Sequence, residues 1–235
     1  MEFPRALIEG ELLKRYKRFL ADVRLPDGSV ITAHSANTGA MTGCCTPGSR
    51  VWLSVSDNPK RKYPHSWELV EVAPRVLCGV NTQLCNELVR EAIEQGVVGE
   101  LQGYARIRGE VRYGQENSRI DLLLEGEEGA TPCYVEVKNV TLAEQGVGYF
   151  PDAVTLRGTR HLRELAAMAA GGQRAVILFC VQRADVNEVR PADRVDPRYG
   201  QTLREALERG VEALAYRAEV SPGGIRLTQR LPVRV

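Results

Sequence analysis

The pattern of apolar residues changes near residue 80, and this change constrains the fold more than any other feature of the sequence. Before it, short apolar runs are separated by turn residues such as Pro26-Asp27-Gly28, where glycine supplies a positive φ and proline fixes its own φ. The runs predict five strands: Arg18 to Leu25, Val30 to Ala33, Val51 to Val55, Trp67 to Val72 and Val76 to Val80. Such strands favour a small closed barrel, of which the OB-fold is the commonest nucleic-acid-binding example, with a split β-sandwich as the alternative.

Beyond Asn81, which offers a helix cap, helical and extended patterns alternate. Helices are expected up to Gly96, from Thr155 to Ala170 and from Tyr199 to Arg209. Strands are expected at Gly103 to Val111, Arg119 to Glu125, Cys133 to Val140, Arg174 to Val181 and Val211 to Val220, with a final hairpin through Ser221 to Gly224. This order favours a mixed sheet covered by helices. We therefore expect an α/β (α+β) protein with domains at 1–80 and 81–235 and a seam near Pro74.

Composition excludes several classes of protein. The chain has 235 residues with 31 Lys and Arg against 30 Asp and Glu, and 43% of it is hydrophobic, which excludes disorder, collagen and coiled coil. Neither a spanning apolar run nor a secretion signal is present, so we expect a cytoplasmic protein without a membrane partner. The six cysteines form no Cys-x-x-Cys pair and the three histidines are scattered, so no zinc is expected. A glycine-rich phosphate loop is also absent, so no nucleotide cofactor is expected.

Three charged residues lie inside predicted apolar strands. Alternation puts Glu136 and Lys138 on one face of their strand, and Asp121 lies on the preceding strand, which forms a predicted hairpin with it. Lys138 is also the only lysine after residue 80. Charges in such positions are costly unless they are paired or bind a metal. Two carboxylates with a lysine can hold a divalent cation and orient water for phosphodiester hydrolysis, whereas the structural alternative is a buried salt bridge.

At the level of whole motifs, the chain resembles a known family. Asp121 and Glu136-x-Lys138 within this order of elements resemble the PD-(D/E)XK nuclease superfamily. The following strings resemble the sugar fermentation stimulation protein A family over essentially the whole chain: Arg15-Tyr16-Lys17-Arg18-Phe19, Asn37-Thr38-Gly39-Ala40-Met41, Asn58-Pro59-Lys60-Arg61-Lys62, Ser118-Arg119-Ile120-Asp121, Glu136-Val137-Lys138-Asn139-Val140-Thr141-Leu142, Phe150-Pro151-Asp152-Ala153 and Arg157-Gly158-Thr159-Arg160-His161-Leu162.

The resemblance implies an OB-like N-terminal part and a nuclease-like C-terminal part. It also implies DNA binding without marked sequence preference and a proposed influence on sugar utilisation. In the nuclease superfamily the corresponding acids bind Mg²⁺ and the lysine attends the attacking water, so Asp121 and Glu136 are the expected ligands of Mg²⁺ or Mn²⁺, with Lys138 beside them. Glu91 is our favoured third ligand, ahead of Glu87 and Glu110.

Basic residues outside this site predict contacts with nucleic acid, DNA in the first place. The predicted contacts are Arg15, Lys17 and Arg18 with neighbouring aromatic rings, the loop cluster Lys60, Arg61 and Lys62, and Arg157, Arg160 and His161 on one helix face. The alternative for each group is a solvated surface, with His161 bonded to a backbone carbonyl. Asn37-Thr38-Gly39 either presents amides to a phosphate or forms a plain tight turn, and Asp152 either caps the next helix or orients Arg157.

Three functions remain open at this point. The chain is a DNA-binding protein, regulatory or not, with a vestigial acidic site, a Mg²⁺-dependent nuclease acting on DNA or RNA of particular structure, or a partner-binding protein on a nuclease-like scaffold. The argument against a vestigial acidic site is that Asp121, Glu136 and Lys138 are all present. The sequence leaves the oligomeric state and any link to sugar metabolism open.

Overall fold

A computed structural model describes residues 1–114, 118–127 and 129–235. The first part is a barrel made by β1 (Ile8–Tyr16), β2 (Leu20–Arg24), β3 (Val30–His34), β4 (Arg50–Val55), β5 (His65–Ala73) and β6 (Val76–Gly79). The strands follow the order β3-β2-β1-β4-β5-β6, and a pairing of β3 with β5 closes a ring of five strands. The predicted barrel is confirmed, and both tryptophans, Trp52 and Trp67, are buried in the core.

Strand β1 was not predicted, and the predicted strand that begins at Arg18 is in fact a turn followed by β2. Lys17 and Arg18 both have positive φ, at 50° and 67°, and connect β1 to β2 as a hairpin. Strand β1 alternates irregularly and contains Gly10, which is unusual in a strand interior. A Cβ at Gly10 would lie 2.5 Å from Val23 Cγ1, so the glycine is required by close packing between neighbouring strands.

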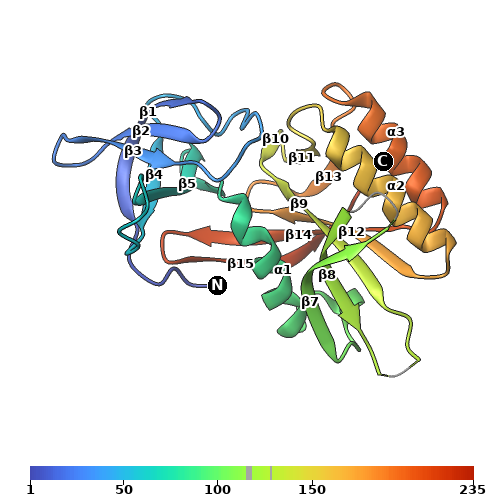
Figure 1. The fold of residues 1–235 in the computed structure, drawn as a ribbon. Coiled ribbons are helices and arrows are strands. Elements are labelled where there is room, and N and C mark those ends of the chain that lie inside the picture. The colour runs from blue at the N-terminus through green and yellow to red at the C-terminus, as the bar shows by residue number, and fades with distance from the viewer. Residues whose placement is uncertain (115–117, 128) are drawn as a thin grey trace.

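The second part is a mixed six-stranded sheet in the order β15-β14-β12-β9-β8-β7 (Figure 1). Its strands are β7 (Arg106–Tyr113), β8 (Ser118–Glu125), β9 (Cys133–Val140), β12 (Arg174–Val181), β14 (Glu212–Ser221) and β15 (Gly224–Leu231). Strand β12, which is apolar from Ala175 to Val181, lies inside the sheet, parallel to both β9 and β14. The predicted β8–β9 hairpin and the final β14–β15 hairpin are both antiparallel pairs, as expected.

Helices cover both faces of this sheet (Figure 1). Helix α1 (Cys85–Glu94), preceded by the 3₁₀ turn η1 (Thr82–Leu84) and followed by η2 (Gly99–Leu101), packs on one face with Val135 and Val137. Helices α2 (Leu156–Ala170) and α3 (Pro197–Glu208) pack on the other face with Ile177 and Phe179. Along β12, alternate residues belong to the two cores, as strand geometry requires.

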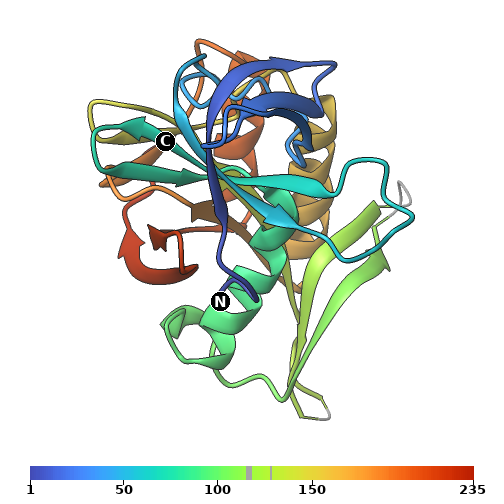
Figure 2. The same ribbon diagram turned by 90° about the vertical axis from the view of Figure 1, so that its left-hand side faces the viewer.

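A small third sheet was not predicted. It consists of β10 (Leu142–Glu144), β11 (Val147–Phe150) and β13 (Glu188–Pro191), which are too short to give a periodic signal. Figure 2 views the molecule from the barrel side, with the N-terminus beside α1, where Phe3 and the 221–224 turn form backbone contacts. Within the described residues, no helix has the length and apolar character needed to cross a bilayer.

Candidate active site

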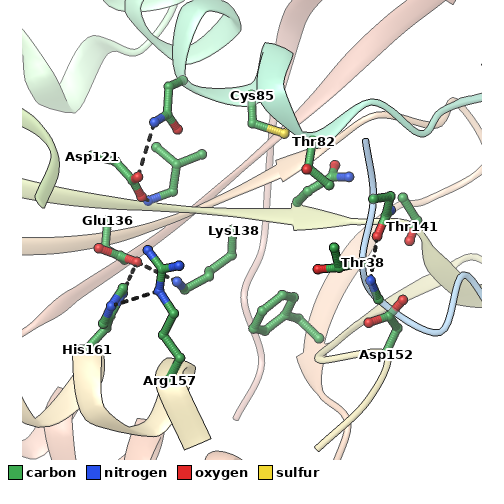
Figure 3. A pocket seen from close by; sticks show the side chains of 16 residues that line it. Thr38, Thr82, Cys85, Asp121, Glu136, Lys138, Thr141, Asp152, Arg157 and His161 are labelled. Atoms are coloured by element: carbon green, nitrogen blue, oxygen red, sulfur yellow. Dashed lines mark hydrogen bonds and ion pairs between the residues drawn. The ribbon is translucent and has the colours of Figure 1, made fainter. Parts of the chain in front are cut away.

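A pocket of about 310 Å³ lies where the barrel meets the open end of the β8–β9 pair. Figure 3 shows Asp121 from β8, Glu136 and Lys138 from β9, and Arg157 and His161 from α2 gathered around it. The opposite wall is formed by Asn37, Thr38 and Gly39 of the barrel together with Asp152. The predicted catalytic residues therefore lie together in one pocket that both parts of the chain line.

Asp121 lies where the pairing of β8 with β9 stops. Leu122 pairs with Val135, and beyond this pair the amide of Val137 donates to Asp121 Oδ2 at 2.7 Å. Asn86 at the start of α1 donates its side-chain amide to Asp121 Oδ1 at 3.1 Å. The carboxylate thus replaces a carbonyl of the strand ladder, and this contact together with Asn86 fixes its position between the sheet and α1.

Glu136 is buried, with 2% of its surface exposed, and its two oxygens differ. Lys138 Nζ donates to Oε1 at 2.5 Å, and His161 Nδ1 also bonds to Oε1. Arg157 Nε donates to His161 Nε2 at 3.4 Å, which makes Nε2 the acceptor and leaves Nδ1 to donate to Glu136. The second oxygen, Oε2, has no hydrogen-bond partner among the described residues. A buried carboxylate oxygen without a partner is costly unless something else binds it.

The two carboxyl groups have opposite pKa shifts. Burial, followed by the charge of Glu136, raises the pKa of Asp121, and Lys138 and two hydrogen bonds only partly compensate. Burial also acts to raise the pKa of Glu136, but Lys138 and His161 outweigh it and hold that pKa below its ordinary value. Glu136 is therefore the stable anion of the pair, and a second anion at Asp121 is disfavoured until positive charge enters the pocket.

The donor set fits a hard divalent cation held in part by water. Asp121 and Glu136 offer carboxylate oxygens, and Oε2 of Glu136 has no other partner among the described residues. A cation would also offset the burial and the repulsion from Glu136 that raise the pKa of Asp121. No group of three or more His, Cys, Asp or Glu side chains with metal-binding geometry occurs in the part of the chain that the structure describes. Neutral oxygens and water would have to complete such a site, as is usual for Mg²⁺.

Glu91, the favoured third ligand, lies elsewhere. Its Oε1 accepts a hydrogen bond from the amino group of Met1 at 2.7 Å, and it lines a second cavity beside the 221–226 hairpin. Glu87 lies 3.7 Å from Arg90, and Glu110 is exposed on β7. None of the three glutamates lines the candidate pocket. Helical spacing correctly puts Glu87 and Glu91 on α1, one turn apart. It could not predict that the helix turns Glu91 toward the N-terminus.

Arg15 has a role that the sequence did not predict. Its Nη2 donates to the carbonyl oxygens of Arg18, Asn37 and Gly39 at 2.5, 2.8 and 3.0 Å. Arg18 Nη2 donates to the carbonyl of Thr38 at 3.0 Å. Both guanidinium groups therefore hold the 37–40 segment against the pocket, and in this structure Arg15 is committed to carbonyl oxygens instead of facing solvent as a phosphate contact.

The 37–40 segment is also tied to the C-terminal part. Asn37 Oδ1 accepts the amide of Gly39 at 2.8 Å, which gives the tight turn that the sequence left as one of two alternatives. Asp152 Oδ2 accepts the amide of Met41 at 2.9 Å. A Cβ at Gly39 would lie 2.5 Å from Asp152 Oδ2, so the two segments pack as closely as glycine allows. Asp152 therefore caps no helix; Thr155 caps α2 instead.

Comparisons with known proteins agree with this architecture. The family model for the SfsA N-terminal OB domain matches residues 13–80, and the model for the sugar fermentation stimulation protein RE domain matches residues 83–224. The chain belongs to the sugar fermentation stimulation protein family.

Similar members of the family match over nearly their full length. The sugar fermentation stimulation protein homologs of Geobacter metallireducens and Thioalkalivibrio sulfidiphilus are 61% and 60% identical over 233 and 234 residues, which is 99% of this chain in both cases and 99% and 98% of those proteins. A solved structure, that of Pyrococcus furiosus SfsA in complex with Ca²⁺, is 30% identical with a TM-score of 0.91 and covers 100% of this chain and 98% of that one.

The remaining predicted contacts of this family member are distributed unevenly. Lys17 is exposed at the β1–β2 turn, and Lys60, Arg61 and Lys62 are exposed between β4 and β5. Arg157 is exposed and lines the pocket, whereas Arg160 is half-buried and does not line it. His161 is buried and bonded to the carboxylate of Glu136, so the structure gives it neither the predicted phosphate contact nor the alternative backbone carbonyl.

Three residues of the site were missed by sequence reasoning. Asn86 orients Asp121, and Cys85 and Thr82 beside it line the pocket. The sequence offered one indication of their role, which is their position at or just before the start of α1. The start of a helix that packs on a sheet can lie beside the ends of the strands. An isolated asparagine is too common at such a position to be selected without coordinates.

Proposed function

We propose that this protein binds nucleic acid, DNA in the first place, and hydrolyses its phosphodiester bonds with a divalent cation held by Asp121 and Glu136. The observation that carries the proposal is the arrangement around Glu136, where Lys138 and His161 bond to one carboxylate oxygen and the other is buried without a partner among the described residues, at a pocket that Glu136 and Asp121 both line. A salt bridge that served only the fold would leave no reason to keep that second oxygen unpaired.

Mg²⁺ or Mn²⁺ is the cofactor that this proposal requires. The similar structure of Pyrococcus furiosus SfsA is a complex with Ca²⁺, which supports a site for hard cations in the family. When bound, such a cation supplies Lewis acidity toward a phosphate oxygen and the attacking water.

The chain's own residues supply orientation and charge. Asn86 and the amide of Val137 hold Asp121, while His161 holds Glu136 in a single orientation. Lys138, with 13% of its side chain exposed, places an ammonium at the pocket wall, where it can orient water and stabilise the extra negative charge of a five-coordinate phosphate. Exposed Arg157 lies in position to contact a flanking phosphate.

In this proposal the barrel supplies contacts to phosphates and one wall of the pocket. Its exposed Lys17 and Lys60–Lys62 carry charge suited to backbone phosphates, while the 37–40 segment forms one wall of the pocket. Contact through phosphates predicts binding without marked sequence preference. A regulatory role in sugar utilisation would then rest on DNA binding, because no sugar-binding site was identified from the sequence.

Lys138→Arg is the most discriminating test. The substitution keeps the positive charge but replaces a compact ammonium with a wider planar group, so we expect at least about a 100-fold loss of cleavage rate with little change in DNA affinity. The assay uses linear, branched and single-stranded DNA and RNA, with Mn²⁺ and with EDTA. Lys14→Arg, an exposed barrel position, is the matched control and should retain the wild-type rate.

Two outcomes would contradict the hydrolase. If no substrate is cut by the wild-type protein, only DNA binding remains. If cleavage persists equally in Lys138→Arg and in EDTA, the activity does not belong to this pocket. Absence of both cleavage and DNA binding would favour a partner-binding protein on a nuclease-like scaffold.

A further inference from the structure

Two arginines face each other across the hairpin that leads to Asp121. Arg112 on β7 pairs directly with Arg119 on β8, and both side chains are exposed. Residues directly opposite in an antiparallel pair lie on the same face with their Cβ atoms about 5 Å apart, and like charges in this position are destabilising. The hairpin therefore places two guanidinium groups together at a cost to its own stability.

This pair points to the α1 side of the sheet, where Asn86 holds Asp121. Ile120 and Tyr113 are buried in the core under α2 and α3, so the adjacent Arg119 and Arg112 point the other way. Alternation is interrupted at Asp121, because Ile120 packs with α2 and α3 whereas Leu122 packs with α1, so it is the hydrogen bond from Asn86 that places Asp121 on the α1 side. Asp121 faces Asn86 of α1 and the pocket, so the two arginines continue that surface outward.

Neighbouring arginines on the same hairpin are matched with acids. Arg108 pairs with Glu125 at 3.3 Å, and Arg106 lies directly opposite Glu125. In contrast, no described carboxylate forms an ion pair with Arg112 or Arg119, including exposed Glu110, two residues from Arg112. Among the described residues of this hairpin, the pair of like charges that lie directly opposite each other is thus found beyond Asp121.

We infer that Arg112 and Arg119 form a phosphate-binding subsite for the backbone of a nucleic-acid strand that passes through the candidate pocket. The inference rests on the proposed function and extends it. The barrel contacts the strand on one side of Asp121 and Glu136, and the arginine pair contacts it on the other side. Two guanidinium groups fit this ligand because each can donate two parallel hydrogen bonds to phosphate oxygens.

The substitution Arg112→Glu separates binding from stability. It replaces a repulsive cross-strand pair with an attractive one, so the melting temperature of the free protein should rise by about 1–4 °C. It also removes one phosphate contact and occupies Arg119 with the new carboxylate. Binding of a fluorescein-labelled 30-base-pair DNA duplex should weaken about tenfold or more at 0.1 M salt, and the salt dependence should lose about two phosphate contacts.

Arg163→Glu is the charge-matched control, because Arg163 is exposed on α2 and forms no ion pair with any described residue. The inference is supported if Arg112→Glu weakens binding and flattens its salt dependence while Arg163→Glu does neither. It is overturned if Arg112→Glu binds as the wild type does, or if both variants weaken binding equally, which would indicate an effect of net charge alone. If the wild-type protein binds no DNA, in single-stranded or duplex form, the proposed function fails, and the inferred phosphate-binding subsite fails with it.

Discussion

Two cavities of this protein differ in how their glutamates are bonded, and only one of them has the properties of a reactive site. The second cavity, beside the N-terminus, is the larger at about 780 Å³, but its Glu91 is partly exposed and paired with an ammonium group. The candidate pocket is smaller, and its Glu136 is buried, with one oxygen that has no partner among the described residues, and lies near the half-buried Asp121. The comparison shows that unsatisfied bonding capacity, rather than cavity size or the number of acids, distinguishes a candidate site.

The largest expected contrast is between the two glutamates. Glu136→Gln should reduce cation-dependent cleavage by more than about 100-fold and leave DNA binding intact or slightly tighter, because a negative charge facing phosphate is removed. Glu91→Gln should leave cleavage unchanged and cost about 1 kcal/mol or less of folding free energy, since its ion pair is partly exposed. Parallel rate and melting measurements test both variants. Equal rates for the two variants would remove the distinction between the cavities.

The barrel wall gives the next contrast. Gly39→Ala would place a Cβ 2.5 Å from Asp152 Oδ2, so the 37–40 segment or Asp152 must move away from the pocket. We expect a loss of about 10- to 100-fold in cleavage rate, because displacement by about 1 Å has such an effect on positioned groups. Gly99→Ala is the control, since no atom lies within 4 Å of its added Cβ. If the Gly39→Ala variant cleaves as fast as the control, the barrel segment is not a functional wall.

Cation binding should distinguish the pockets by melting temperature. Asp121→Asn should raise the melting temperature in EDTA by a few degrees, because burial and the charge of Glu136 disfavour the anion at Asp121. Mn²⁺ in large excess should raise the melting temperature of the wild type by about 5–10 °C and that of Asp121→Asn by much less. If Glu91→Gln abolishes the rise in melting temperature with Mn²⁺ and Asp121→Asn retains it, the cation binds in the second cavity and the account is contradicted.

The smallest effect is expected at the exposed loop between β4 and β5, which touches neither cavity. Changing Lys60, Arg61 and Lys62 to Gln should weaken DNA binding by a similar factor on unrelated sequences and lower the salt slope by up to about three. The control changes three exposed arginines at the helical side of the molecule, Arg163, Arg198 and Arg209, to Gln. Unchanged affinity of the loop variant at several salt concentrations would remove this loop from the interface.

The sequence predicted the barrel, the mixed sheet and the grouping of Asp121, Glu136 and Lys138. Each of these follows from a local periodic pattern, and β9 alone fixes the shared face of Glu136 and Lys138. Strand β1 was missed because Gly10 interrupts its pattern, although close packing against Val23 explains that glycine.

Contacts between segments that are far apart in the sequence could not be predicted from hydrophobic periodicity or motifs. Arg15 bonds to carbonyl oxygens 22 and 24 residues away, and Glu91 bonds to an amino group 90 residues away. Such partners carry no sequence signature, because every residue has a carbonyl group. The same limit applies to His161, whose partner, Glu136, lies on a different element.

Anomalous diffraction from crystals soaked in Mn²⁺ tests the central claim most directly. The account predicts a peak in the candidate pocket, with Mn²⁺ coordinated by Asp121 and by the unpaired Oε2 of Glu136 at about 2–2.6 Å. Absence of a peak there at a saturating concentration, or a peak only beside Glu91 in the second cavity, would contradict it.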